Sequence, residues 1–385
     1  MNKATLTIMC FMLCATATFH AAAQEYNPIP VALPSLQIAP DARGGGMGDI
    51  GAASMPDVYS QHWNAAKYPF ISGEAGIAFS YTPWLSKLVD DIHLLYMSAY
   101  QKFGNDNLNT ISASLRYFSL GNIEVGQAGD LWQTISPHES ALDVAYSRRL
   151  TETFSGAVTL RYIRADYSTG DDETTPGNAF SADIAGYNEL YLYMGRSEAL
   201  LGLGFNISNI GTKISYDGGN SSMFLPANLR AGVSLGYPLD PKNTISVSFD
   251  ANKLLVPTPQ LPQSDETDEE AQQRIDDYQS ISSIGGIFKS LSDAPGGFKE
   301  EMQEVMWSLG AEYSYDNRFF VRTGYYHENE YKGNRRYFTF GAGFKSGIFQ
   351  IDAAYLVSSA QSNPLDQTLR LSLGFDMEGI KNLMR

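Results

Sequence analysis

The stretch Leu369-Arg370-Leu371-Ser372-Leu373-Gly374-Phe375-Asp376 places an apolar residue at every odd position and a polar or small one at every even position. Because successive side chains of a β-strand point to opposite faces, this stretch predicts a strand with one apolar and one polar face. About fourteen segments share the pattern, and they begin near residues 73, 91, 108, 139, 154, 180, 200, 227, 244, 306, 319, 335, 348 and 367. The fold class that we predict is all-β: a closed, antiparallel transmembrane barrel of the outer-membrane kind, in which no strand edge meets lipid.

The connections between these segments alternate in length. The short ones are polar turns at 104–107, 151–153, 196–198, 240–242, 316–318 and 346–347. The long ones are at 83–90, 119–138, 166–179, 209–226, 254–305, 328–334 and 358–366. Outer-membrane barrels have short periplasmic turns and long extracellular loops, so we expect both chain termini on the periplasmic side. A large soluble all-β protein is the competing interpretation, but ordinary hairpins give no reason for such strict alternation.

Composition agrees with a membrane barrel. The chain has 23 Tyr and 20 Phe but only 18% charged residues, as expected for aromatic girdles and a lipid-facing band. A mean hydropathy of -0.21 argues against a helical membrane protein, since no segment after the first 23 residues approaches twenty uncharged apolar residues. The formal net charge of -15 makes nucleic acid an improbable partner.

The N-terminus predicts a secretory signal peptide over residues 1–23. Lys3 precedes an apolar run over 6–19, and three alanines follow at 21–23. Cleavage before Gln24 would remove both cysteines, at positions 10 and 14, and with them any disulfide. The expected organisation is a signal peptide at 1–23, an N-terminal hatch inside the lumen at 24–72, the barrel at 73–376 with an acidic extracellular insert at 256–304, and a periplasmic C-terminal tail at 377–385.

A glycine-rich stretch marks the expected hatch. Gly46-Met47-Gly48-Asp49-Ile50-Gly51 matches a dinucleotide-binding fingerprint by its letters. It lacks the context, because no buried strand precedes it and no βαβ unit follows. We interpret these glycines as residues that let the backbone turn tightly in a confined lumen.

Charged residues at inward-facing strand positions predict a network that anchors the hatch. The barrel residues are Asp143, Arg161, Arg230, Asp250, Asp352 and Arg370. Their candidate partners in the hatch are Asp41, Arg43 and Asp49. A polar path for a substrate is the alternative interpretation.

In this region the chain resembles the FadL-like outer-membrane family, and most of all its PorV branch. The residues that carry the resemblance are Leu36, Ile38, Ala39, Pro40, Asp41, Ala42, Arg43, Gly46, Met47, Gly48, Asp57 and the Trp63-Asn64 pair. The chain departs from the family at Asn64-Ala65-Ala66, where Asn-Pro-Ala is usual. The hatch residues that we single out are Asp41, Arg43, Gly44, Gly46, Met47, Gly48, Asp49 and Asn64.

The resemblance implies a component of the type IX secretion system. PorV-like proteins associate with the translocon barrel, receive cargo through its C-terminal signal domain and carry it to a surface sortase subunit. FadL-like members can instead transport small hydrophobic molecules across the outer membrane, and the sequence leaves that alternative open. We expect no cofactor, no metal and no catalysis, because the histidines have no metal-ligand spacing and no Gly-x-Ser-x-Gly motif occurs.

The insert carries much of the negative charge, in the run Ser264-Asp265-Glu266-Thr267-Asp268-Glu269-Glu270. This run lacks the turn glycine of a calcium loop, so we expect a solvated loop. Further on, Ile281, Ile284, Ile287, Phe288 and Leu291 recur at near-helical spacing. They predict a short helix that caps the barrel mouth or binds a partner.

Apolar residues in the long loops are candidate docking residues for cargo, because exposed apolar side chains need a membrane or a partner to cover them. They are Trp84, Leu85, Trp132, Met223, Phe224, Leu225, Ile287 and Phe288. Phe224 is the first choice, since it lies in the middle of its loop. The alternatives are that these side chains pack on each other to close the mouth or sit in the outer aromatic girdle.

Overall fold

The computed structural model describes residues 26–377 apart from 86–88, 90, 105, 127–132, 168–173, 196, 220, 263–265 and 360–364. The expected signal peptide, Trp132 and the expected tail from residue 378 onward lie outside the described residues.

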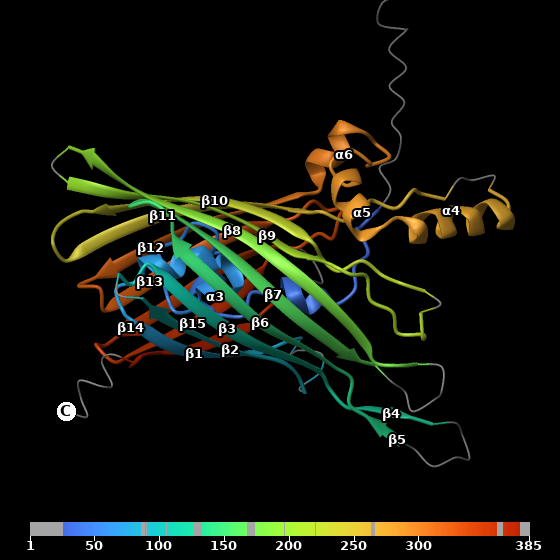
Figure 1. The fold of residues 1–385 in the computed structure, drawn as a ribbon, viewed down its shortest axis with the longest axis horizontal. Coiled ribbons are helices and arrows are strands. Elements are labelled where there is room, and N and C mark those ends of the chain that lie inside the picture. Colours follow the sequence, from blue (N-terminus) through green and yellow to red (C-terminus); the bar gives the residue numbers. More distant parts are fainter. Residues whose placement is uncertain are drawn as a thin grey trace, which may run out of the picture.

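Fourteen strands form one closed antiparallel barrel, which confirms the predicted fold class (Figure 1). Around the barrel the order is β1-β16-β15-β14-β13-β12-β11-β10-β9-β8-β7-β6-β3-β2. Their bounds are β1 Ala75–Pro83, β2 Ile92–Phe103, β3 Asn109–Leu120, β6 His138–Arg149, β7 Phe154–Asp166, β8 Gly177–Met194, β9 Ser197–Gly211, β10 Asn228–Pro238, β11 Asn243–Leu254, β12 Val305–Tyr315, β13 Phe319–His327, β14 Arg336–Lys345, β15 Phe349–Ser358 and β16 Leu369–Asp376. A separate two-stranded sheet, β4 Ile123–Val125 with β5 Gln133–Ile135, lies within the β3–β6 connection.

The two faces of the barrel wall differ as the alternating sequence requires. Outward-facing side chains such as Phe79, Leu160 and Leu371 are apolar and exposed. Inward-facing neighbours such as Ser80 and Arg161 are polar and buried. A soluble protein has polar residues outside and apolar residues inside, whereas this wall has the reverse, as in a barrel that is surrounded by lipid and has a polar interior. In the part of the chain that the structure describes, no helix has the length and apolar character needed to cross a membrane.

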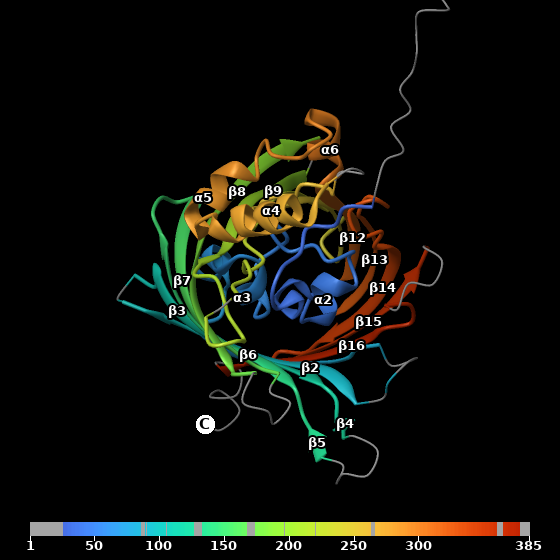
Figure 2. The same ribbon diagram turned by 90° about the vertical axis from the view of Figure 1, so that its right-hand side faces the viewer.

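The segment before β1 fills the lumen. Figure 2, which looks onto one barrel mouth, shows α2 (Ala42–Gly45) and α3 (Ser60–Trp63) inside the ring of strands. Two 3-10 turns accompany them, η1 (Pro34–Gln37) and η2 (Ala65–Phe70). The Asn64 side chain caps η2 by accepting from the backbone N–H of Ala66 at 3.0 Å. The local turn is therefore capped with alanine in the position where proline is usual.

The hatch runs from one end of the barrel to the other. At the long-loop end, the N–H of Asn27 donates to the carbonyl of Tyr331 at 2.9 Å. At the short-turn end, Lys102 near the end of β2 donates to the carbonyl of Ile71. The first described residues therefore lie at the long-loop end, which differs from the expectation of both termini at the short-turn end. That expectation rested on the position of β1 alone, and the hatch is long enough to reach the opposite mouth.

The insert folds into three helices over the long-loop end (Figures 1 and 2): α4 (Asp268–Ser280), α5 (Ser283–Lys289) and α6 (Phe298–Gln303). The expectation of a loop for the acidic run is wrong over 268–270, which form the first turn of α4. Thr267 and Glu270 make a capping box there, and acidic residues in a first turn are favoured by the helix dipole. The helix predicted from the apolar spacing corresponds to α5.

Candidate functional site

A chain of alternating charges ties the hatch to the inside of the barrel. Arg43 of the hatch pairs with Asp57 and with Glu312 of β12, at 3.2 Å for the latter. Arg322 of β13 pairs with the same Glu312 and, at 2.7 Å, with Asp352 of β15. These side chains are almost completely buried. Because removing one member would leave an uncompensated buried charge, the network holds the hatch firmly in place.

A second set of contacts anchors the glycine-rich stretch. Asp49 accepts from Arg370 at 2.8 Å and from the Tyr337 hydroxyl at 2.6 Å, as predicted for an anchoring pair. Asp250 of β11 accepts from the backbone N–H groups of Gly51 and Ala52, each at 2.9 Å. Barrel carboxylates and arginines thus bind both side chains and backbone of the hatch.

Other members of the predicted network have different partners. Asp41 forms no ion pair with an arginine among the described residues: it caps α2 by accepting from the N–H of Gly44, and it accepts from the Trp63 indole. Arg230 does reach a predicted partner, since it donates to the carbonyl of Asp49 at 3.4 Å, and it also lies over the Trp63 ring at 4.5 Å. Arg161 binds Asp143 and Asp183 within the barrel wall, and so it does not contact the hatch through these bonds. Sequence reasoning missed Glu312 and Arg322, although their register pairing on neighbouring strands could have indicated them.

The glycines of the hatch permit close contact with the barrel wall. Gly48 has a φ of 79°, and a Cβ there would lie 2.9 Å from the backbone nitrogen of Tyr325. A Cβ on Gly46 would lie 3.1 Å from the Cα of Gly341, and one on Gly44 would lie 2.5 Å from the Trp63 ring. Met47 between them is buried. The stretch serves packing, which agrees with the interpretation that rejected a dinucleotide site.

Asn64 links three parts of the lumen. Besides capping η2, its side-chain amide donates to the carbonyls of Ala52 at 2.8 Å and of Gly186 on β8 at 3.0 Å. In the described ranges, no three His, Cys, Asp or Glu side chains are grouped so that they could hold a metal ion.

At the long-loop mouth, the placement of Phe224 corrects the sequence-based expectation. Phe224 is 5% exposed and Leu225 is also buried. The Phe224 ring packs edge-on against Tyr278 of α4 and lies 4.1 Å from the Lys213 ammonium. The premise that Phe224 is exposed in the middle of a loop is wrong, because the insert folds over this loop.

The remaining predicted docking residues divide by exposure. Met223 is 41% and Phe288 is 71% exposed. Ile287 and Leu85 are half-buried, and the half-buried Trp84 packs against a cluster that includes Leu94. Among the predicted docking residues that the structure describes, Met223 and Phe288 are therefore the two that are exposed.

A cluster of lysines and glutamates fixes the insert to the barrel rim, and we call it the α6 latch: Lys253, Lys332, Glu300, Glu301 and Glu304. Lys253 at the end of β11 bonds Glu301 at 2.9 Å and Glu304 at 2.6 Å. Lys332 of the β13–β14 loop bonds Glu300 and, at 3.1 Å, Glu304. Burial raises the pKa of Glu300 and Glu301, but bonds from the lysines and from backbone N–H groups outweigh it and hold each pKa below its usual value.

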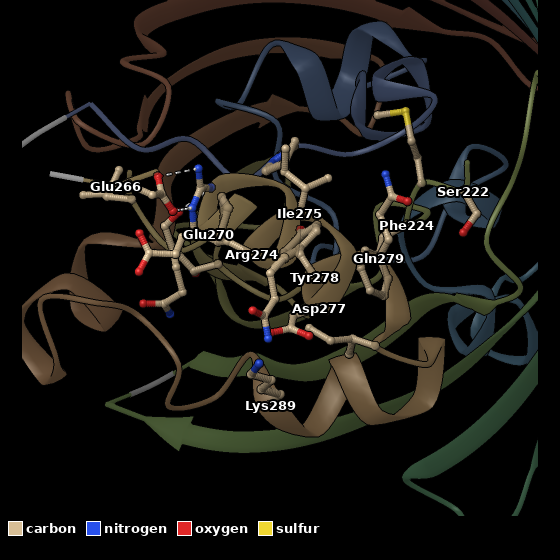
Figure 3. Close-up of a pocket in the computed structure, with 18 residues that line it drawn as sticks. Ser222, Phe224, Glu266, Glu270, Arg274, Ile275, Asp277, Tyr278, Gln279 and Lys289 are labelled. Atoms are coloured by element: carbon tan, nitrogen blue, oxygen red, sulfur yellow. Dashed lines mark hydrogen bonds and ion pairs between the residues drawn. The ribbon is translucent and has the colours of Figure 1, made fainter. Parts of the chain in front are cut away.

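Between α4 and the barrel mouth lies a cavity of about 770 Å³, shown in Figure 3 and called here the α4 groove. Its apolar lining includes Phe224 and Tyr278. Its acidic lining includes Glu270 and Asp277. Residues 258–261, which belong to no helix or strand, also line it. The arrangement offers apolar surface with carboxylates beside it.

These features define an integral outer-membrane β-barrel whose lumen is occupied by its own N-terminal segment. Residues 21–261 match the family described as type IX secretion system protein PorV. The chain belongs to this family.

Similar solved structures are transporters and a FadL homologue with little sequence in common. The toluene transporter TodX of Pseudomonas putida is 11% identical, with a TM-score of 0.47 over 91% of this chain and 99% of that one. TbuX of Ralstonia pickettii, also a toluene transporter, is 12% identical, with a TM-score of 0.44 over 88% and 96%. A FadL homologue of Pseudomonas aeruginosa is 10% identical, with a TM-score of 0.44 over 91% and 100%. No curated protein matches the chain in sequence.

Proposed function

We propose that this protein binds the C-terminal signal domains of secreted cargo at the type IX translocon barrel and passes them to a surface sortase subunit. Membership of the PorV family supports the secretion system. The observation that carries the proposal is the occupied lumen. The hatch is bonded to the wall through buried charges, so that the long-loop end is the face left for binding.

The long-loop end has the character of a binding face. The α6 latch holds the insert in a fixed position, so a partner would meet a preformed surface rather than a free loop. Met223 and Phe288 present apolar side chains among polar neighbours, the composition of compact protein-binding surfaces. In this proposal the long loops face the cell exterior, as is general for outer-membrane barrels.

Deletion of the gene tests the proposal. We expect cargo proteins to accumulate unprocessed in the periplasm, while uptake of fatty acids and toluene stays unchanged. Complementation with the intact chain should restore surface attachment. Normal cargo processing together with lost uptake would instead favour a transporter of small hydrophobic molecules and refute the proposed function.

Substitution at the mouth tests where cargo docks. Phe288→Asp places a charge on a side chain that is 71% exposed, and we expect it to reduce co-purification of a cargo signal domain about fivefold or more. Tyr193→Asp is the control, because Tyr193 is 85% exposed but belongs to the β8–β9 hairpin at the short-turn end. Heat-modifiable migration on gels should remain normal for both. Equal cargo recovery from the two variants would reject docking through Phe288.

A further inference from the structure

Helix α4 covers the barrel mouth without burying a face. None of its residues is buried, although one face lines the α4 groove with Glu270, Gln273, Arg274, Asp277 and Tyr278. These five positions follow helical spacing and so lie on one side of the helix, and Ile275 and Gln279 of α4 also line the groove. Most of these side chains are polar, and the space beneath them is a cavity.

The walls of the groove are held by bonds that do not depend on a ligand. The Tyr278 hydroxyl donates to the carbonyl of Pro257 at 2.9 Å. Lys213 donates to the carbonyl of Gln279 at 2.7 Å. The N–H of Ala32 donates to the carbonyl of Phe224 at 2.9 Å, which fixes the floor to the start of the hatch. The groove is therefore preformed, and binding there would cost little ordering of the protein.

The charge around the groove is negative when the whole of helix α4 is counted. Arg274 is neutralised by Glu266, with bonds of 2.8 and 3.2 Å, as the dashed lines in Figure 3 show. Two cations then remain beside the groove, Lys289 of the lining and Lys213 next to the Phe224 ring, against the carboxylates of Glu270 and Asp277. Helix α4 adds three further acidic residues on its other faces, Asp268, Glu269 and Asp276. Such a field attracts a cationic partner and repels phosphate or other anions.

The aromatic floor fits the same kind of partner. One side of the Phe224 ring is occupied by the chain's own Lys213 ammonium at 4.1 Å, so the floor offers a ligand apolar contact with the rings rather than a site for a second cation. Tyr278 lies edge-on to this ring at 5.7 Å. The alkyl stem of a lysine or arginine can cover these rings while its charged end reaches the carboxylates.

We propose that the α4 groove binds an extended polypeptide segment that carries lysine or arginine beside apolar side chains. This inference rests on the proposed function in one respect: a cargo signal domain would supply the segment. The cavity of about 770 Å³ has room for a few residues of an extended chain. The acidic lining argues against lipid headgroups, which carry phosphate.

Peptide binding to the purified full chain in detergent tests the inference. The probe is a fluorescein-labelled ten-residue peptide in which valine alternates with lysine, and its match has glutamate in place of each lysine. Fluorescence anisotropy should show saturable binding of the lysine peptide that weakens with salt, and no binding of the glutamate peptide. Binding of both peptides, or of neither, would overturn the inference.

A pair of neighbouring residues provides matched variants. Asp277→Lys reverses a charge that lines the groove, and we expect it to lower the affinity for the lysine peptide about fivefold or more. Asp276→Lys makes the same change on an adjacent face of α4, outside the lining, and should alter binding less than about twofold. Equal effects of the two variants would show attraction to the whole helix and would overturn a groove site.

A purified cargo signal domain as a second probe separates the two proposals. If the peptide binds in the groove and the cargo domain does not bind at all, the groove stands and the proposed function fails. If the cargo domain binds wild type and Asp277→Lys equally, and the peptide also binds both equally, the proposed groove site is refuted while the proposed function is supported.

Discussion

At the scale of single residues, the buried charges between hatch and barrel determine how firmly the lumen is closed. Arg322 contacts both Glu312 and Asp352, and its side chain has no exposed surface. Without Arg322, Glu312 would keep Arg43 as a partner, whereas Asp352 would lose the cation that offsets its cost of desolvation. Each such arginine is therefore worth far more to stability than the many charged pairs on the surface.

Arg322→Met tests this at one residue. We expect the free energy of unfolding to fall by about 3–5 kcal/mol, because Glu312 and Asp352 lose a shared partner. Arg164→Met is the control, since the partly exposed Arg164 lies 3.9 Å from Asp166. We expect this variant to lower the free energy of unfolding by less than about 1 kcal/mol. Unfolding in urea, followed by heat-modifiable migration on gels, measures both. Equal losses would mean that the buried chain of charges does not stabilise the hatch.

Gly48 tests the close approach of hatch and wall. Gly48→Ala adds a Cβ 2.9 Å from the backbone of Tyr325 at a φ of 79°. Gly218→Ala is matched in backbone conformation, with a φ of 70°, but nothing lies within 4 Å of its Cβ. The left-handed conformation costs either alanine about 1–2 kcal/mol, and only Gly48→Ala must also push the wall aside. Thermal unfolding should therefore rank Gly48→Ala below Gly218→Ala, and the reverse order would contradict the packing role.

The sequence revealed some of these residues and hid others. Asp49 and Arg370 could be predicted as partners, because one lies in the hatch and the other at an inward strand position. Glu312 and Arg322 could have been predicted as partners in the same way, since the short turn at 316–318 sets them opposite each other on neighbouring strands. Asp41 was predicted as a partner of the lumen charges but caps α2, because a residue that caps a helix and one that pairs with a lumen cation look alike in sequence.

At the scale of elements, strands were easier to predict than helices. Every barrel strand begins within a few residues of its predicted start, because a period of two is visible wherever lipid covers one face. Helix α4 was missed although Thr267 and Glu270 have the spacing of a capping box. The cover over Phe224 could not be predicted, since it depends on where the insert folds back.

The α6 latch makes the insert sensitive to acid. The pKa of Glu300 and of Glu301 is lower in the folded protein than its usual value near 4.3, so the latch contributes stability above that pH and loses it as the pH falls through the folded pKa. Limited proteolysis should cut the insert faster at pH 3 to 4 than at pH 6, with no change between pH 6 and 8. A constant rate across this range would contradict a glutamate latch.

Removal of one latch lysine should mimic acid at neutral pH. Lys332→Met deprives Glu300 and Glu304 of a shared cation, and we expect cleavage of the insert to quicken about tenfold at pH 7. Lys299→Met removes an exposed lysine from the same helix α6 and should leave the rate unchanged. Cleavage at the same rate in both variants would show that α6 is held by other contacts.

At the scale of the whole molecule, the alternation of short and long connections was enough to predict a closed barrel. The path of the hatch could not be predicted. An irregular segment has no periodic pattern in its sequence, so nothing in the sequence indicates toward which mouth of the barrel it runs. The structure places Asn27 against the β13–β14 loop and the insert, so the hatch spans the barrel from end to end. The two ends of the described chain lie at opposite mouths.

This placement leads to a topology that intact cells can test. With the long loops outside, Tyr26 lies at the cell surface, whereas the β8–β9 hairpin with Tyr193 lies in the periplasm; the two side chains are 60% and 85% exposed. The sequence has cysteine only at positions 10 and 14, so Tyr26→Cys and Tyr193→Cys each give a single reactive thiol once the expected signal peptide is removed. A maleimide that cannot cross the outer membrane should label Tyr26→Cys in intact cells and Tyr193→Cys only after the membrane is permeabilised. Labelling of Tyr193→Cys alone in intact cells would place the short turns outside, and the insert with its α4 groove would then face the periplasm, where it could not hand cargo to a surface sortase.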